Sequence, residues 1–79
     1  MSNLEKYKEA FMTALELTED QLSGLEYKNV ASWDYVGHIA LISAIEEAFD
    51  IMMDTEDIIA FSSFEKGKEI LSSKYDVEF

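Results

Sequence analysis

The segment Trp33-Asp34-Tyr35-Val36-Gly37-His38 gathers several side chains that could take part in binding or group transfer. Asp34 stands where an N-cap belongs, directly before a run with helical periodicity, so Tyr35 is expected at an exposed helix start. Amide N–H groups and the helix dipole favour a phosphate at such a place. On residue type alone, an exposed aromatic side chain without a role is the simpler interpretation of Tyr35. Gly37 lacks a side chain, which should let something approach closely beside position 35.

A catalytic or metal-binding set cannot be assembled from this composition. His38 is the only histidine and there is no cysteine. The chain therefore has too few residues of the types that bind zinc or form a nucleophile–base pair. We therefore expect no catalytic residue and no metal-ligating residue, and we expect His38 at the surface or at an interface. The acidic run Asp54–Asp57 lacks the spacing and the central glycine of an EF-hand loop, so no dedicated calcium site is expected.

Charge restricts the class of partner. Seventeen acidic residues against six basic ones give a formal net charge of −11. Repulsion disfavours nucleic acid and anionic membrane surfaces as partners, whereas a basic protein surface is favoured. The simpler alternative is that the acidity only keeps a small protein in solution.

Length and composition predict one domain, residues 1–79, with enough apolar side chains for a core. Hydrophobic residues make up 48% of the chain, and they include Trp33, five Phe and four Tyr. No apolar stretch approaches the roughly 18–20 residues that span a bilayer. The first six residues lack a basic segment followed by an apolar one, as a secretory signal would have. We therefore expect a cytoplasmic protein that does not bind membranes.

Apolar residues at steps of three and four predict an all-α fold with four helical segments. The first should run from about Asn3 to Leu17. The second should follow Asp34 and continue to Phe49. A brief third helix should be capped by Asp54 or Thr55 and end near Phe61. Ser62 or Ser63 should cap the last helix, and residues 75–79 should form a frayed tail.

The stretch between the first two long helices has weak periodicity. Thr18 and Gln21 have the spacing of a capping box, which predicts one short turn of helix. Apolar side chains from the rest of this loop should pin it onto the core; they are Leu22, Leu25, Tyr27 and Val30.

The run from Trp33 to Ile39 resembles the prosthetic-group attachment motif of the acyl carrier proteins, which have Asp-Ser-Leu or Asp-Ser-Val there, often before Gly-His-Ile. The resemblance continues through Leu41–Ile51 and Asp54–Ile58, and length, acidity and helix order agree over essentially the whole chain. It implies a four-helix acyl carrier-type bundle with three longer helices and one short third helix. Tyr35 stands where that family has its attachment serine.

The resemblance also implies a function. In acyl carrier proteins the serine bears 4′-phosphopantetheine, on which acyl intermediates of lipid or secondary metabolite biosynthesis are presented to enzymes; the carrier itself is not an enzyme. Asp34 and Val36 would flank the attachment point. Tyr35 is expected to remain unmodified, so no cofactor is expected on this chain. The sequence does not separate a natural loss of serine from an engineered replacement.

Partners and an acyl-binding cleft follow from the same resemblance. The partners would be a phosphopantetheinyl transferase and acyl-transferring or synthase enzymes with basic surfaces. The acids expected to contact them are Glu46, Glu47, Asp50, Glu56 and Asp57. The cleft between the second and third helices would be lined by Ile42, Ile45, Met53, Ile58 and Phe61. The alternative is an interaction module that kept the fold, lost the arm and binds a basic protein constitutively.

Overall fold

The computed structural model of the protein describes residues 2–79, and within them it contains four α-helices, one 3₁₀ turn and no β-strand. The helices are α1 (Asn3–Leu15), α2 (Tyr35–Phe49), α3 (Thr55–Ala60) and α4 (Phe64–Lys74), and the 3₁₀ turn η1 spans Glu19–Gln21. The predicted all-α bundle of three longer helices and a short third one is confirmed. No helix in the described part of the chain combines the length and the apolar character that crossing a membrane requires.

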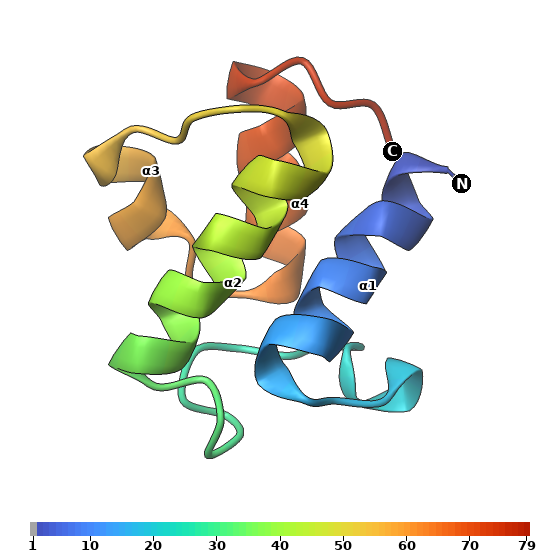
Figure 1. Cartoon of the computed structure of the whole chain (residues 1–79), viewed down its shortest axis with the longest axis vertical. Coiled ribbons are helices and arrows are strands. Elements are labelled where there is room, and N and C mark those ends of the chain that lie inside the picture. Colours follow the sequence, from blue (N-terminus) through green and yellow to red (C-terminus); the bar gives the residue numbers. More distant parts are fainter. Residues whose placement is uncertain (1) are drawn as a thin grey trace.

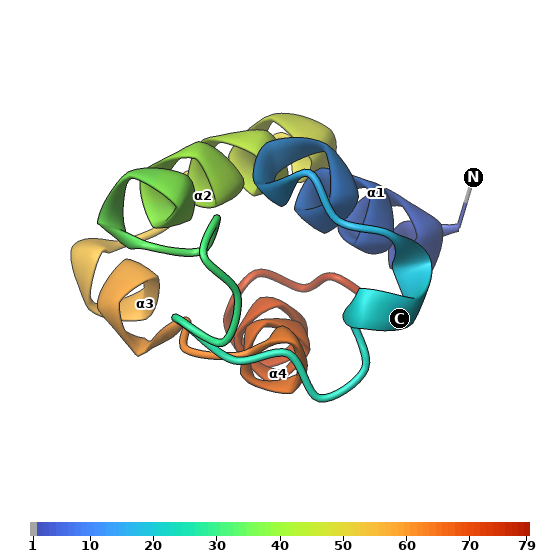
Figure 2. The same ribbon diagram turned by 90° about the horizontal axis from the view of Figure 1, so that it is seen from below.

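The helices form two layers. Helices α1 and α2 lie side by side in one layer, and α3 and α4 lie in the other (Figures 1 and 2). The long loop after α1 crosses the α4 side before it climbs to the start of α2 (Figure 2). It is tied to the α3–α4 junction by two backbone hydrogen bonds, from the Tyr27 N–H to the Ser62 carbonyl and from the Phe64 N–H to the Leu25 carbonyl, both 2.9 Å.

Residues that sequence reasoning assigned to this loop behave as expected. The Thr18 N–H donates to Gln21 Oε1 at 2.8 Å, which closes η1. Leu22 and Leu25 are buried, and Tyr27 and Val30 pack half-buried against the core. The loop is therefore a fixed part of the bundle.

Helix α1 starts at a capping box, in which the Glu5 N–H donates to Ser2 Oγ at 3.1 Å and the Ser2 N–H donates to Glu5 Oε1 at 3.3 Å. It ends at Leu15, two residues before the expected end. Glu16 takes a left-handed conformation with φ of 55°, and the Leu17 N–H donates back to the Met12 carbonyl at 3.1 Å. This closing turn satisfies a free carbonyl and stops the helix.

Helix α3 also ends one residue early, at Ala60, because Phe61 leaves the helical conformation to enter the core. Of the two candidate caps for α4, Ser63 is the one that acts: its Oγ accepts from the Lys66 N–H at 2.9 Å. The expected N-cap of α2, Asp34, and its end at Phe49 are both confirmed.

Aromatic rings dominate the core between α1 and α4. The Tyr7 ring lies 5.0 Å from Phe11 and 4.9 Å from Phe64, and Phe11 in turn lies 5.4 Å from Trp33. Tyr7 is fully buried, and its hydroxyl donates to the Phe64 carbonyl at 2.6 Å. Burial raises the pKa of the Tyr7 hydroxyl well above its usual value, so the group remains a neutral donor.

The expectation of a frayed tail is wrong. Val77 is buried and its N–H donates to the Leu71 carbonyl at 3.1 Å. The Phe79 ring packs 5.2 Å from Tyr7, and Asn3 Nδ2 donates to the Glu78 carbonyl at 2.9 Å. Alternating residues of the tail thus close one end of the core, and the tail lies beside the start of α1 (Figure 1).

Gly67 allows α4 to approach this core. A Cβ added there would overlap Tyr7 Oη and the Phe61 ring. We expect Gly67→Ala to lower the free energy of unfolding by about 1–3 kcal/mol, as overpacking does, although Ala ordinarily stabilises a helix relative to Gly. Urea unfolding followed by circular dichroism measures the change. The control is Ser72→Ala at an exposed position of α4. A Gly67→Ala protein as stable as the wild type would contradict the packing described.

Candidate functional site

The start of α2 presents residue 35 to solvent on a rigid element. Asp34 Oδ1 accepts from the Gly37 N–H at 2.8 Å, which caps the helix. Tyr35 is the first helical residue and is 71% exposed, and Val36 is 72% exposed. The three residues predicted for an attachment point therefore stand together, and the two that follow the cap face solvent.

Gly37 serves a different purpose from the one expected. A Cβ at this position would overlap the Ser32 carbonyl oxygen and lie 3.2 Å from Leu15 Cδ2. The close approach that the missing side chain permits is made by the chain's own loop. Gly37 therefore fixes how the loop meets α2, and it leaves no room for an outside molecule on that side.

A chain of two side-chain hydrogen bonds joins this loop to α2 and α3. Trp33 is fully buried, and its Nε1–H donates to His38 Nδ1 at 2.9 Å. The opposite nitrogen of the same ring, His38 Nε2, lies 2.8 Å from the Ile58 carbonyl oxygen of α3. His38 is half-buried and lies between the loop, α2 and α3.

These partners define the proton position on His38. The Trp33 indole is a donor only, so Nδ1 must offer its lone pair, and the Ile58 carbonyl is an acceptor only, so Nε2 must carry the proton. The histidine is therefore the neutral Nε2–H tautomer. Three rings surround it, at centroid distances of 5.5 Å for Tyr27, 6.1 Å for Trp33 and 6.1 Å for Phe61.

A cavity of about 480 Å³ lies between α2 and α3, next to Tyr35. Its wall is mostly apolar, and its few polar groups include the His38 ring and the Thr55 and Ser62 hydroxyls. The lining residues are Tyr27, Tyr35, His38, Ile39, Thr55, Ile58, Ile59, Phe61 and Ser62. Ile39 and Ile59 are 52% and 76% exposed, so apolar side chains continue from the cavity onto the surface around it.

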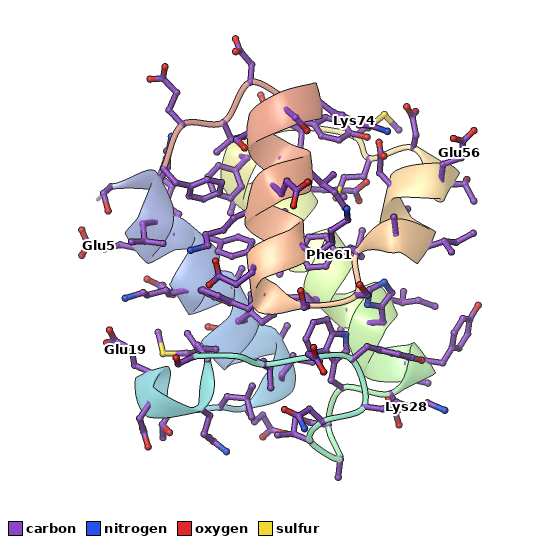
Figure 3. All side chains as sticks on the ribbon, turned by 180° about the vertical axis from the view of Figure 1, so that it is seen from behind. Glu5, Glu19, Lys28, Glu56, Phe61 and Lys74 are labelled. Atoms are coloured by element: carbon purple, nitrogen blue, oxygen red, sulfur yellow. The ribbon has the colours of Figure 1, made fainter. Side chains whose placement is uncertain are left out.

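Only two of the five residues predicted to line an acyl cleft line this cavity. Ile58 and Phe61 do so. The remaining three, Ile42, Ile45 and Met53, are buried in the core of the bundle and are not among the residues of this cavity wall. Their place in an acyl cleft stays a prediction. Phe61 lies among the helices, whereas Glu56 points outward (Figure 3).

The predicted partner-binding acids fall into two groups. Glu47, Asp50 and Glu56 are exposed. Glu46 is half-buried, and its Oε2 accepts from the Met53 N–H at 2.9 Å, which braces the turn after α2.

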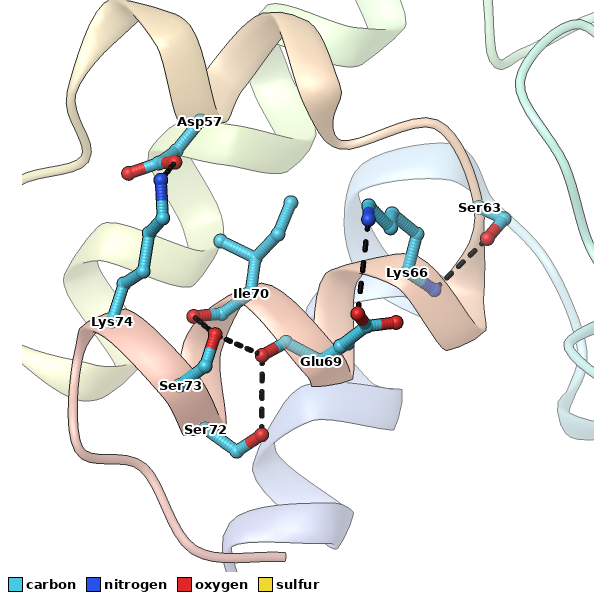
Figure 4. A network of polar contacts seen from close by, with 8 residues as sticks. All are labelled: Asp57, Ser63, Lys66, Glu69, Ile70, Ser72, Ser73 and Lys74. Atoms are coloured by element: carbon cyan, nitrogen blue, oxygen red, sulfur yellow. Dashed lines mark hydrogen bonds and ion pairs between the residues drawn. The ribbon is translucent and has the colours of Figure 1, made fainter.

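Asp57 is a correction, because its carboxylate is engaged within the fold. The residue is 3% exposed. Lys74 Nζ donates to Asp57 Oδ1 at 2.7 Å, as Figure 4 shows, and the Tyr75 hydroxyl donates to Asp57 Oδ2 at 2.6 Å. The same hydroxyl accepts from the Asp54 N–H at 2.8 Å. Asp57 therefore anchors α3 to the end of α4.

The hydrogen bonds from Lys74 and Tyr75 hold the pKa of Asp57 below its usual range. A carboxyl with a lowered folded-state pKa stabilises the protein above its unfolded pKa, and this contribution is lost as the pH falls through the folded value. We therefore expect Asp57→Asn to lower the midpoint of thermal unfolding near pH 7, with a difference from wild type that narrows towards about pH 3. Thermal melts across this range measure it.

The matched control for this prediction is Glu69→Gln, whose only ion pair is a long one of 3.8 Å to Lys66 between exposed side chains (Figure 4). This variant should melt close to wild type throughout. If the midpoint of thermal unfolding of Asp57→Asn lies below that of wild type by the same amount at both ends of the pH range, the charge of Asp57 is not what stabilises α3.

Comparisons with known proteins add no relative. No family model, no curated protein and no solved structure matches the chain with statistical significance. Within residues 2–79, no group of three or more His, Asp or Glu side chains is placed to hold a metal ion. The features that bear on function are the exposed residue 35, the hydrogen bonds of His38 and the cavity.

Several residues of this site were not predicted as cavity residues from the sequence. Ile39 lies one helical turn after Tyr35, and Thr55 and Ile59 flank Ile58 on a short helix, so helical spacing could have indicated them. Tyr27 comes from an irregular loop and carried no such signal. Its place depends on the loop's backbone bonds to Ser62 and Phe64.

Proposed function

We propose that the protein is an acyl carrier-type domain whose attachment position is occupied by Tyr35. A form with serine there would present phosphopantetheine-linked acyl intermediates to biosynthetic enzymes in the cytoplasm, without being an enzyme itself. The observation that carries the proposal is the exposure of residue 35 at the first position of α2, held by the Asp34 cap and next to an apolar cavity. The motif resemblance around Trp33–Ile39 supports it independently.

The location of residue 35 at an exposed helix start is suitable for a phosphodiester. The outward N–H groups at the start of α2 favour an anion, and the exposed backbone there would admit a transferase. The cavity beside it is mostly apolar, so an acyl chain of modest length would lose contact with water there. Asp34 holds the helix start, and Val36 is free to contact a partner enzyme.

The side chain now at this position does not fit the group. A Tyr35 hydroxyl stands several ångströms farther from the backbone than a serine hydroxyl would. Transfer depends on alignment with the donor, and misplacement of about 1 Å costs on the order of a hundredfold in rate. The chain as given is therefore expected to dock on a transferase and remain unmodified.

The decisive variant is Tyr35→Ser. With coenzyme A, magnesium and a broad-specificity phosphopantetheinyl transferase, we expect this variant to gain the prosthetic group, because a short primary hydroxyl then stands at the exposed first position of α2. The wild-type chain and Tyr35→Ala should gain nothing. Intact-mass spectrometry gives the result, and peptide mapping locates the group.

Two outcomes would count against the proposal. Modification of the wild-type chain at Tyr35 would refute the argument from alignment. Failure of a folded Tyr35→Ser variant to react would mean that the resemblance stops at the fold.

A second candidate function is an arm-less module that binds a basic protein constitutively. The observation favouring it is the set of exposed apolar residues around the cavity, on a stretch of the chain that carries only acidic charges. Residues 29–65 contain no Lys or Arg. Such a surface suits an apolar contact ringed by a partner's basic side chains. This alternative becomes the better one if Tyr35→Ser is folded and inert.

The carrier proposal also predicts that exposed acidic side chains contribute to recognition by a transferase. In the Tyr35→Ser background we expect Glu47→Gln and Glu56→Gln each to lower kcat/KM of the transferase, because both acids are exposed near the modified helix. An exposed charge contributes about 0.2–1 kcal/mol, which is a factor of up to about five. The loss should shrink as salt is added. Glu69→Gln on α4 is the matched control. An equal loss of kcat/KM in this variant would show that only the net charge of the protein matters, and not the position of the acid.

A further inference from the structure

Helix α3 is held to its neighbours by two polar anchors, at the adjacent residues Asp57 and Ile58. The Asp57 carboxylate binds Lys74 and Tyr75, which belong to α4 and its end. The carbonyl of the next residue, Ile58, accepts from His38 of α2 at 2.8 Å. Among the hydrogen bonds of the described residues, this one alone joins α2 to α3, and it crosses the cavity wall to which both residues contribute.

We propose that His38 is a proton-sensitive latch: as the neutral Nε2–H tautomer it closes α3 against α2, and protonation at Nδ1 releases α3 and opens the cavity. The proton comes from solvent and adds to the Nδ1 lone pair, and only hydrogen bonds are broken. The inference goes beyond the proposed carrier function and does not require it, because it concerns access to the cavity whatever occupies it.

The buried Trp33 makes the latch sensitive. Its indole N–H is fully enclosed and has His38 Nδ1 as its partner. With a proton on Nδ1, two donors would face each other at 2.9 Å, and the indole would lose its acceptor. The imidazolium relieves this conflict by turning away, and the same turn withdraws Nε2 from the Ile58 carbonyl. Both bonds therefore break together.

Among the described residues that line the cavity around His38, none is acidic. The loop contributes the Tyr27 ring, and the Lys28 ammonium lies 5.8 Å from the centroid of that ring. The α3–α4 junction contributes Phe61 and Ser62.

The acids of the neighbouring helices do not face the ring either. On α2, the Asp34 carboxylate caps the helix through the Gly37 N–H, and Tyr35 offers only a neutral hydroxyl. On α3, Asp57 is bound by Lys74, and Glu56 is exposed; neither acid lines the cavity. A protonated His38 is therefore better solvated outside its present position.

The second anchor decides what α3 does after release. Lys74 and Tyr75 keep the pKa of Asp57 below its usual range, so this anchor persists where histidine ordinarily titrates. Helix α3 is then expected to turn about the Asp57 anchor, so that the Ile58 carbonyl next to it moves away from His38, without unfolding of the bundle. The opening would expose Ile58 and Phe61, and access of an apolar ligand or partner side chain to the cavity would increase in acid.

The experiment is a titration from about pH 7.5 to about pH 5.5, in which histidine ordinarily changes charge. Two-dimensional NMR follows the Trp33 indole resonance and the α3 amides, and hydrogen exchange, corrected for its intrinsic pH dependence, reports opening of α3. In the wild type we expect the chemical shifts of the Trp33 indole and of the α3 amides to change with the same pH midpoint. Hydrogen exchange of the α3 amides should become at least about tenfold faster at the acidic end.

The matched variant is His38→Gln, which keeps one acceptor and one donor but cannot take up a proton in this range. Its indole and α3 signals should not move, and amides at the start of α1 provide an internal reference in both proteins. The wild-type titration decides the question even if the variant does not fold. A stationary indole, or an indole that titrates while α3 exchange stays constant, would overturn the latch. So would an unchanged transition in folded His38→Gln.

Discussion

A single buried donor, the Trp33 indole N–H, constrains the whole candidate site. It is fully enclosed, so leaving it without an acceptor would cost about 1–3 kcal/mol. His38 supplies the acceptor, and this fixes the rotation of the start of α2 relative to the loop. The free side of the same imidazole then reaches α3. One hydrogen bond requirement thereby sets the positions of a loop and two helices, and with them the wall of the cavity.

The remainder of the bundle holds these parts in place. Tyr7 and Phe11 of α1 pack on Phe64 and Trp33, so the aromatic core reaches from α4 to the loop that carries the indole. Gly67 and Gly37 act alike, since each removes a side chain where another element must approach closely. At the start of α2, Tyr35 and Val36 both face solvent. The fold therefore presents two exposed side chains on a capped helix terminus, as a carrier or a docking module would.

Helix types and most helix starts could be predicted from the sequence, because they depend on local signals. Apolar spacing identified the four helices, and Asp34 and Ser63 act as caps where short polar side chains precede apolar runs. The ends of the helices were harder to predict from the sequence. Glu16 adopts a left-handed conformation that glycine usually provides, so no residue type marked the end of α1.

Long-range pairing explains the other differences. Asp57 appeared to belong to a surface acidic cluster, and only the approach of Lys74 and Tyr75 from the far end of the chain removes it from solvent. The resemblance implied that Ile42, Ile45 and Met53 line a cleft, and burial in the core of the bundle depends on how the helices pack, which local sequence signals do not give. The tail was expected to fray, yet Val77 and Phe79 find partners on α4 and α1.

The protonation pattern of His38 near neutral pH is the most direct test of this arrangement. Nitrogen NMR of the imidazole ring, with long-range correlations to its carbon-bound protons, distinguishes the two neutral tautomers from the imidazolium. We expect Nε2 to carry the proton and Nδ1 to show the shift of an acceptor, with the Trp33 indole proton displaced downfield by its hydrogen bond. A proton on Nδ1, or an indole resonance typical of a solvent-exposed tryptophan, would contradict the geometry on which the site depends.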